Sequence, residues 1–243
     1  LPHPSTMRFA IFLAAIVLLA ASVEAKPAPS KDNSWDFMLL SLLWPEQECR
    51  HIKPCIVPES VNYFTIHGLW PERADMTYPE HCPGEGFDHS ALDGLRDQLN
   101  AWWPDFKSPG SNDFYQHEWS THGTCATGKS IEGMRTQTEY FTLALSLRER
   151  LNTTDVLAAA GIKPSHEQSY TLEAIQKAIS KTYGFYPLLY CSTEKGGKTA
   201  IWQIKYCVGA DLDFMDCPAN ELQRAIDHGG CNIEAIYLMP KEN

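Results

Sequence analysis

The sequence predicts an α+β fold in which several helices pack around a central antiparallel sheet. Apolar runs of strand length lie towards both ends of the chain, and segments with helical spacing lie between them. Eight cysteines, an even number spread along the chain, predict that disulfides hold this fold together.

Three segments have the composition of strands. Residues 35–44 and 61–66 are short apolar runs. In residues 200–206 every second residue is apolar and those between them are expected to be polar or exposed, which is the pattern of a half-buried strand.

Three further segments have helical patterns. In residues 92–102, leucines and a tryptophan recur at helical spacing, and Pro104 would end that helix. Residues 140–151 read as a second helix. The third helix would begin after Thr171, a candidate N-cap, and would end at Gly184.

The N-terminal residues predict export. Residues 9–23 form an apolar stretch after a single arginine, and this stretch is shorter than the roughly 20 apolar residues that span a bilayer. We therefore expect residues 1–25 to be upstream sequence and a cleaved signal peptide, without a membrane anchor. Residues 26–243 would form one domain, because no Pro-, Gly- or Ser-rich linker divides them. The mature protein would be a monomer that is secreted or reaches the lysosomal or endosomal lumen, and the sequon at Asn152 predicts a glycosylated surface position.

Two histidine-containing segments carry the candidate chemistry. The first reads Phe-Thr-Ile-His-Gly-Leu-Trp-Pro and contains His67. The second reads His-Glu-Trp-Ser-Thr-His-Gly-Thr-Cys and contains His117, Glu118 and His122. Because histidine both takes and gives a proton near neutral pH, three histidines and a carboxylate indicate acid/base catalysis without a metal or cofactor.

The second segment is expected to be helical. Glu118 and His122 are four residues apart, so they would share a face, where the carboxylate could orient the imidazole and favour its protonated form. His117 and His122 are five residues apart and would point about 140° away from each other on a regular helix. A zinc peptidase needs histidines four apart in an HExxH motif, so the HExxxH spacing disfavours zinc.

Both segments resemble, almost residue for residue, the signature segments of the ribonuclease T2 family. The resemblance runs from about residue 35 to about residue 238 and implies the α+β architecture of that family. It also implies an endoribonuclease that cleaves single-stranded RNA through a 2′,3′-cyclic phosphate to 3′-phosphate ends. DNA, which lacks the attacking 2′-hydroxyl, would be inert. His122 maps onto the general base and His67 onto the general acid, while His117 and Glu118 map onto residues that bind and polarise the phosphate.

The resemblance implies further pairings and contacts. The disulfides would join Cys49 to Cys55, Cys82 to Cys125, Cys191 to Cys231 and Cys207 to Cys217. One base site would contain Trp70, Glu72 and Tyr78, and a second would contain Phe114. Glu72 could accept from an exocyclic amine and so favour adenine or cytosine over uracil, although a solvated loop position is an equal alternative. The remaining histidines are expected to be structural or surface residues: His51, His81, His89, His166 and His228.

Thr121 departs from the family pattern, since family members usually carry lysine at this position. The ammonium group stabilises charge that develops on the phosphate, whereas a threonine hydroxyl only donates a hydrogen bond. Loss of one such donor costs about 10²–10³ in rate, so we expect an active but slowed enzyme in which Thr121 contacts substrate. The alternative is a catalytically weakened secreted glycoprotein that binds a protein or a cell surface.

The net charge of −10 disfavours a tight RNA-binding module, because phosphate neutralisation supplies most nonspecific affinity. Removal of residues 1–25 leaves this charge unchanged and removes one of the nine histidines. Protonation of the other eight would bring the charge to about −2. We therefore expect weak RNA binding and an optimum at about pH 5 to 6.

Overall fold

The computed structural model describes residues 33–194 and 196–241, and its centre is a seven-stranded sheet. The strand order is β2-β1-β5-β7-β3, with β4 and β6 also paired to β5. Neighbouring strands are antiparallel except β5 and β7, so the predicted antiparallel sheet is confirmed apart from this one pair. The strands are β1 (Phe37–Leu43), β2 (Thr65–Glu72), β3 (Ser169–Tyr170), β4 (Leu188–Thr193), β5 (Thr199–Val208), β6 (Phe214–Met215) and β7 (Ile236–Tyr237).

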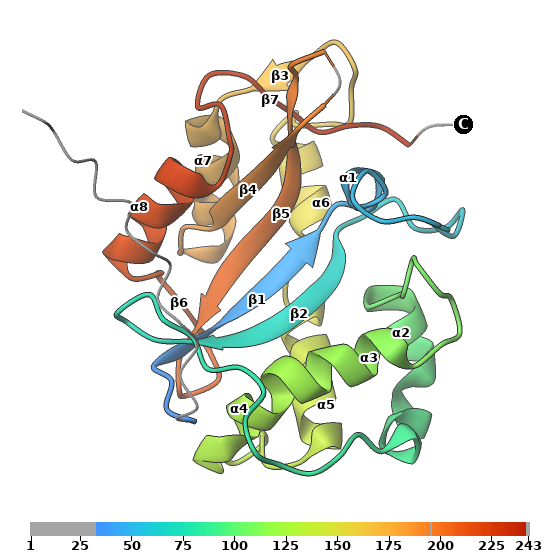
Figure 1. Cartoon of the computed structure of the whole chain (residues 1–243). Helices are drawn as coiled ribbons and strands as arrows, with labels where there is room; N and C mark the ends of the chain where they lie inside the picture. The colour runs from blue at the N-terminus through green and yellow to red at the C-terminus, as the bar shows by residue number, and fades with distance from the viewer. Residues whose placement is uncertain (1–32, 195, 242–243) are drawn as a thin grey trace, which may run out of the picture.

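Helices surround this sheet. Figure 1 shows α5 and α6 behind the strands, α8 beside β4, and α2, α3 and α4 next to the edge formed by β2. The α-helices are α1 (Pro45–Glu48), α2 (Arg96–Trp102), α3 (Asp113–Glu118), α4 (Thr124–Ala126), α5 (Gln137–Glu149), α6 (Thr153–Ala159), α7 (Leu172–Tyr183) and α8 (Ala219–His228). Short 3₁₀ segments are η1 (His89–Leu95) and η3 (Thr127–Lys129), and η2 (Trp119–Gly123) is a π-helical turn.

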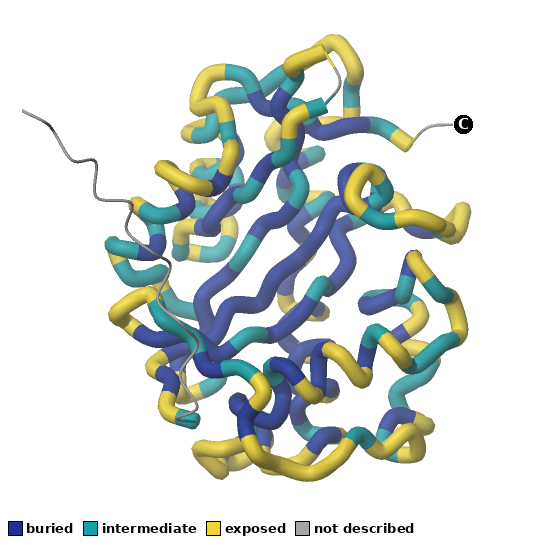
Figure 2. Tube along the Cα trace, viewed as in Figure 1, coloured by how far each residue is buried: buried dark blue, intermediate teal, exposed yellow. Residues whose placement is uncertain are grey.

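The two central strands, β1 and β5, are buried on both faces, as the dark blue tube in Figure 2 shows. One face carries Leu42 and Ile204 into the main core. The other face carries Leu39, which packs with Leu188 and with Ala225 of α8. The expectation that residues 200–206 form a half-buried strand is therefore wrong, because α8 covers the second face.

Two predicted boundaries also differ from the structure. Residues 61–66 were expected to form a strand, but β2 begins at Thr65, and Val61 instead packs with Phe106 in a small cluster outside the sheet. Residues 92–102 do not form one helix, since the 3₁₀ segment η1 continues to Leu95 before α2 begins. The spacing of apolar residues indicates which side chains are buried. A buried side chain can lie outside a sheet or in a 3₁₀ segment, so the spacing does not fix the type of element.

Local signals specify the other helices well. Thr171 accepts a hydrogen bond from the backbone N–H of Ala174, and Gly184 ends α7 with φ of +86°, so both predicted caps are confirmed. The helix expected in residues 140–151 begins earlier, because Thr136 and Glu139 form a capping box that starts α5.

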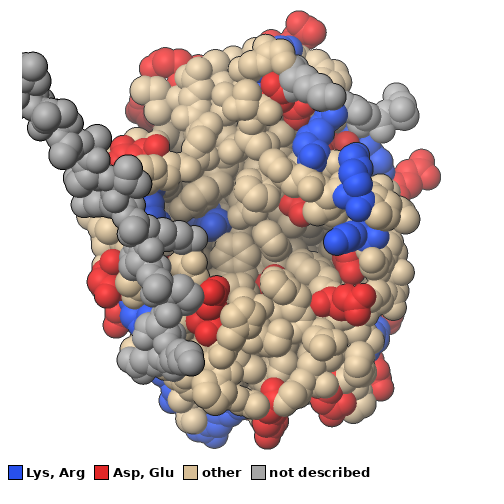
Figure 3. Space-filling view, viewed as in Figure 1, with Lys and Arg blue, Asp and Glu red and all other residues tan. Residues whose placement is uncertain are grey.

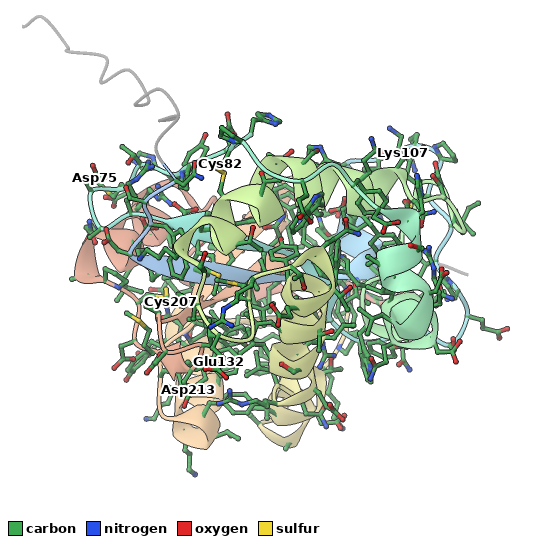
Figure 4. The ribbon with its side chains drawn as sticks, turned by 90° about the horizontal axis from the view of Figure 1, so that it is seen from below. Asp75, Cys82, Lys107, Glu132, Cys207 and Asp213 are labelled. Atoms are coloured by element: carbon green, nitrogen blue, oxygen red, sulfur yellow. A yellow bond between two sulfur atoms is a disulfide. The ribbon has the colours of Figure 1, made fainter. Side chains whose placement is uncertain are left out.

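The four disulfides join the same cysteines that the family resemblance implies. Cys82–Cys125 is the most informative, because it ties the segment after β2 to α4 across 43 residues of sequence. Figure 4 shows Cys82 beside the helices of the second histidine segment. This bond therefore links the two histidine-containing parts of the chain.

The predicted leader, residues 1–25, lies outside the described residues. Within residues 33–194 and 196–241, the helices are too short or too polar to cross a membrane. Asn152 is exposed at the start of α6, where its side chain donates to Asp155, so the predicted surface position of the sequon is confirmed.

Candidate active site

A β-bulge in β2 positions the first histidine segment. Ser41 of β1 pairs with Gly68 and Leu42 pairs with Ile66, so His67 is the extra residue in β2. In a regular strand, residues three apart point to opposite faces. The bulge instead brings the rings of His67 and Trp70 together, with centroids 5.0 Å apart.

The backbone and ring of His67 are both held. Its carbonyl oxygen accepts a hydrogen bond of 2.9 Å from the Trp103 indole. Its Nδ1 lies 3.0 Å from the side-chain amide of Gln203, which is in turn hydrogen-bonded to Ser41. Because Nδ1 is occupied, Nε2 is the ring nitrogen left for a ligand.

The π turn η2 positions the second segment. The backbone N–H of Thr124 donates to the carbonyl of Trp119, an i→i+5 bond that widens one turn of the helix. As a result the rings of His117 and His122 lie 6.4 Å apart, and the expectation that they point about 140° apart is wrong. Gly123 permits this turn, since a Cβ there would lie 2.3 Å from the Trp119 ring.

Glu118 is oriented by Trp70 and not by His122. Its Oε2 accepts a 2.9 Å hydrogen bond from the Trp70 indole, and the residue is only 1% exposed. The predicted Glu118–His122 contact is therefore wrong, because the π turn removes the four-residue register on which that expectation depended. Gly68 makes room for the Glu118 carboxyl, since a Cβ at Gly68 would lie 2.2 Å from Oε2.

Trp70 is the centre of the cluster. Its ring centroid lies 5.0 Å from that of His67 and 5.4 Å from that of His122. Histidines from the two distant segments therefore both lie close to one indole ring, and the N–H of that ring donates to the Glu118 carboxyl.

Burial and mutual proximity perturb the acid/base properties of these groups. Burial, followed by the nearby Lys205 and His117, lowers the pKa of His67 to about 3. Burial, followed by the neighbouring histidines and Lys205, lowers the pKa of His122 to about 3. Burial raises the pKa of Glu118 to about 8, although the hydrogen bond from Trp70 opposes this shift. Opposite shifts in adjacent acids and bases are typical of catalytic sites.

The predicted base-site residues fall into two groups near the histidines. Trp70, Glu72 and Tyr78 line a cavity of about 1220 Å³ that also reaches His122. Glu72 is 6% exposed at the end of β2, 3.9 Å from Arg224, so the alternative of a solvated loop acid is wrong. Phe114 does not line this cavity, and its ring lies near the other histidine, with its centroid 6.2 Å from that of His67.

Thr121 lies within the cluster but is largely enclosed. It is 5% exposed, and its hydroxyl lies 3.5 Å from Nδ1 of His117. Its carbonyl oxygen accepts from the backbone N–H of His81, which was expected to be structural and whose ring also influences His122. In the part of the chain that the structure describes, no group of three or more His, Cys, Asp or Glu side chains has an arrangement that could hold a metal ion.

Comparison with known proteins identifies the family. A model of the ribonuclease T2 family matches residues 35–217. This chain belongs to the ribonuclease T2 family. It is 33% identical to Ribonuclease 1 of Arabidopsis thaliana over 237 residues, which cover 93% of this chain and 98% of that protein. It is 35% identical to Ribonuclease DdI of Dictyostelium discoideum over 216 residues, covering 87% of this chain and 92% of that protein.

The fold of this T2-family ribonuclease agrees with that of solved relatives. It matches the crystal structure of RNase NT in complex with 5′-AMP with a TM-score of 0.73 and 31% identity, over 86% of this chain and 100% of that chain. The predicted fold class is therefore confirmed.

Sequence reasoning missed the contribution of β5 to the site of this ribonuclease. Gln203 contacts His67, and Lys205, two residues further along the strand, lies beside Trp70. Both residues break the apolar pattern of the strand at alternating positions, and two polar side chains on one face of a central strand are a signal that could have indicated a site.

Proposed function

We propose that this ribonuclease is a secreted or lysosomal endoribonuclease that cleaves single-stranded RNA by transphosphorylation without a metal ion. The observation that carries the proposal is the convergence of His67 and His122 on the same Trp70 ring, with centroid distances of 5.0 and 5.4 Å. Two imidazoles on either side of one phosphodiester are what paired proton transfer requires.

In the first step, His122 accepts the proton of the ribose 2′-hydroxyl while the 2′-oxygen forms a bond to phosphorus. The bond between phosphorus and the 5′-oxygen breaks, and His67 protonates that oxygen. The product is a 2′,3′-cyclic phosphate. In the second step, water attacks phosphorus, His67 accepts the water proton, and His122 protonates the departing 2′-oxygen, which leaves a 3′-phosphate.

The perturbed pKa values favour acidic conditions. His67 must carry a proton to act as the acid, and its pKa of about 3 means that the free ring is mostly neutral at physiological pH. A bound phosphodiester anion opposes this shift, because an opposite charge favours the imidazolium. We place the optimum at or below about pH 5, the lower limit of the range that the sequence predicts.

A neutral Glu118 suits a phosphate site. Since its pKa is about 8, Glu118 is protonated in acid and adds no negative charge beside the substrate. It can then donate a hydrogen bond to a non-bridging phosphate oxygen, and His117, which is exposed at the edge of the cluster, can bind another.

The surroundings of the histidines are suited to unstacked bases. The cavity beside Trp70 offers aromatic side chains and Glu72 on one side, and Phe114 offers a ring on the other. Figure 3 shows that charged side chains are sparse over the middle of this face and lie mainly around its edge. Single-stranded RNA would therefore be held by stacking and by the reacting phosphate more than by a basic surface.

The disulfides and the N-terminal sequence support the proposed secretion or delivery to the lysosome. Four disulfides need an oxidising compartment, and the apolar residues 9–23 supply a route to it. Expression in a eukaryotic host should give a medium-borne monomer that starts near residue 26 and carries a glycan on Asn152. An uncleaved chain retained in the cells would contradict this part of the proposal.

The cleavage proposal is tested with single-stranded RNA and DNA of the same sequence, each with and without EDTA at acidic pH. We expect EDTA-resistant cleavage of RNA alone, with cyclic-phosphate ends appearing before 3′-phosphate ends. His67→Ala and His122→Ala should abolish cleavage, whereas His166→Ala, an exposed histidine outside the cluster, should have no effect. Loss of RNA cleavage in EDTA, or equal cleavage of DNA, would refute the proposal.

A second candidate is a secreted glycoprotein that keeps the fold but acts by binding a protein or a cell surface. Thr121 is the observation that favours it, because a threonine brings no charge to the phosphate. The assay above separates the two functions, since a binding protein would leave RNA intact while folding normally.

A further inference from the structure

Lys205 occupies an unusual place for a charged residue, in the middle of the central strand β5. It is half-buried and pairs with Ser41 on β1 and with Leu188 on β4. Residues two apart on a strand share a face, so Lys205 lies on the same side of the sheet as Gln203, which contacts His67.

The ammonium group is held between two aromatic rings at the site. Nζ lies 4.7 Å from the centroid of Trp70 and 4.1 Å from that of Tyr190. Both His67 and His122 also lie close to the Trp70 ring, so the amine lies against the centre of the cluster. Lys205 and His122 both line the large cavity.

The electric field of Lys205 reaches both candidate catalytic histidines. Its positive charge disfavours the imidazolium form and contributes to the lowered pKa of His67 and of His122. Glu221 on α8 also interacts with Lys205, but this carboxyl is 2.7 Å from Arg224, which supplies a closer cation.

Thr121 leaves the second histidine segment without the lysine that family members usually carry. We propose that Lys205 replaces it, contacting a non-bridging oxygen of the scissile phosphate and stabilising the charge that develops there. This inference rests on the proposed RNA cleavage. The amine stays protonated throughout, so it makes no covalent or proton-transfer step. The cation has moved from the helical segment to β5, and the active site keeps its positive charge despite Thr121.

The first test is neutral substitution. Lys205→Met keeps most of the side-chain length and should lower kcat/KM for RNA by about 10²–10³, mainly through kcat, whereas Lys205→Arg should retain most activity. The matched control is Lys198→Met, because Lys198 lies over the Tyr237 ring just before β5 and does not contribute to the lowered pKa of His67 or His122. Equal activity of the Lys205→Met and Lys198→Met proteins would overturn the proposal.

The second test separates charge from packing. Loss of the ammonium should raise the pKa of both histidines, so the pH profile of kcat/KM should move towards neutral pH in Lys205→Met only. Adding Thr121→Lys to the Lys205→Met protein should restore activity, while the same change in the wild type should have a much smaller effect. An unmoved pH profile would show that Lys205 only shapes the cavity. If the protein with lysine at position 121 does not fold, the pH profile and the Lys205→Arg protein still decide the question.

Failure of the proposed function would be visible separately, as a wild type that leaves RNA intact. In that case calorimetric binding of inorganic phosphate decides the role of Lys205. Weaker binding by Lys205→Met than by Lys198→Met supports a phosphate contact, and equal binding overturns it.

Discussion

Glu118 should make the stability of this protein unusually dependent on pH. Its carboxyl is buried with a pKa of about 8, against an ordinary value of 4.5 in the unfolded chain. Between these values the folded state binds more protons than the unfolded state, so this group lowers the free energy of unfolding as pH rises through that window. The penalty is about 1 kcal/mol at about pH 5 and about 4 kcal/mol at about pH 7.5.

Glu118→Gln removes this titration and keeps an amide oxygen that can accept from the Trp70 indole. The gain in free energy of unfolding should therefore be larger at about pH 7.5 than at about pH 5, by about 3 kcal/mol. Urea denaturation followed by tryptophan fluorescence, with disulfides intact, measures this difference. With a urea m-value of about 1–3 kcal/mol/M, the extra gain moves the midpoint by at least about 1 M.

The two histidines of lowered pKa also make stability depend on pH, but they titrate in both proteins and cancel in the comparison. Glu167→Gln, a change at an exposed carboxyl, is the matched control and should give the same midpoint difference at both pH values. If Glu118→Gln behaves like this control, the account of Glu118 as a buried neutral acid is wrong.

Two further substitutions test the framework of the site. Gly68→Ala places a Cβ within 2.2 Å of both Trp70 Nε1 and Glu118 Oε2, so it should displace that hydrogen bond and lower RNA cleavage by about 10²-fold while circular dichroism stays native. An alanine protein of full activity would contradict the proposed close approach. Replacing Cys82 and Cys125 by serine opens a loop of 43 residues and should cost about 4 kcal/mol of stability, measured by guanidinium denaturation. An unchanged midpoint would mean that this bond does not constrain the unfolded chain.

Elements with local signals could be predicted from the sequence, and elements that depend on distant packing could not. Thr171 and Gly184 specify the ends of α7 because each acts on its own neighbouring backbone. Val61 is apolar like a strand residue, but it packs with Leu43 and Phe106. Both partners are distant in the sequence, so the spacing of apolar residues around Val61 does not predict this contact. The same limit explains β5, whose second face is covered by α8 from a later part of the chain.

The two motifs predict which residues form the candidate site, but they do not predict how the side chains of those residues are arranged. The residues of both motifs do converge, and the implied Cys82–Cys125 bond links them. The predicted contact between Glu118 and His122 requires a regular α-helix, and the π turn η2 interrupts it. The packing of Gly123 on Trp119 accompanies the π turn, and that contact is visible only in three dimensions.

Each motif contains one irregular turn of the backbone that brings its side chains to the site. The bulge in β2 puts His67 and Trp70, three residues apart, on the same side of the strand. The π turn in the second segment brings together His117 and His122, which a regular helix would separate. In each case one extra residue in the local hydrogen-bond register turns side chains towards the common site. Each segment also carries a glycine at a close contact: a Cβ at Gly68 would overlap Trp70 and Glu118, and a Cβ at Gly123 would overlap the Trp119 ring. The two segments therefore specify these irregular turns as well as the catalytic residues.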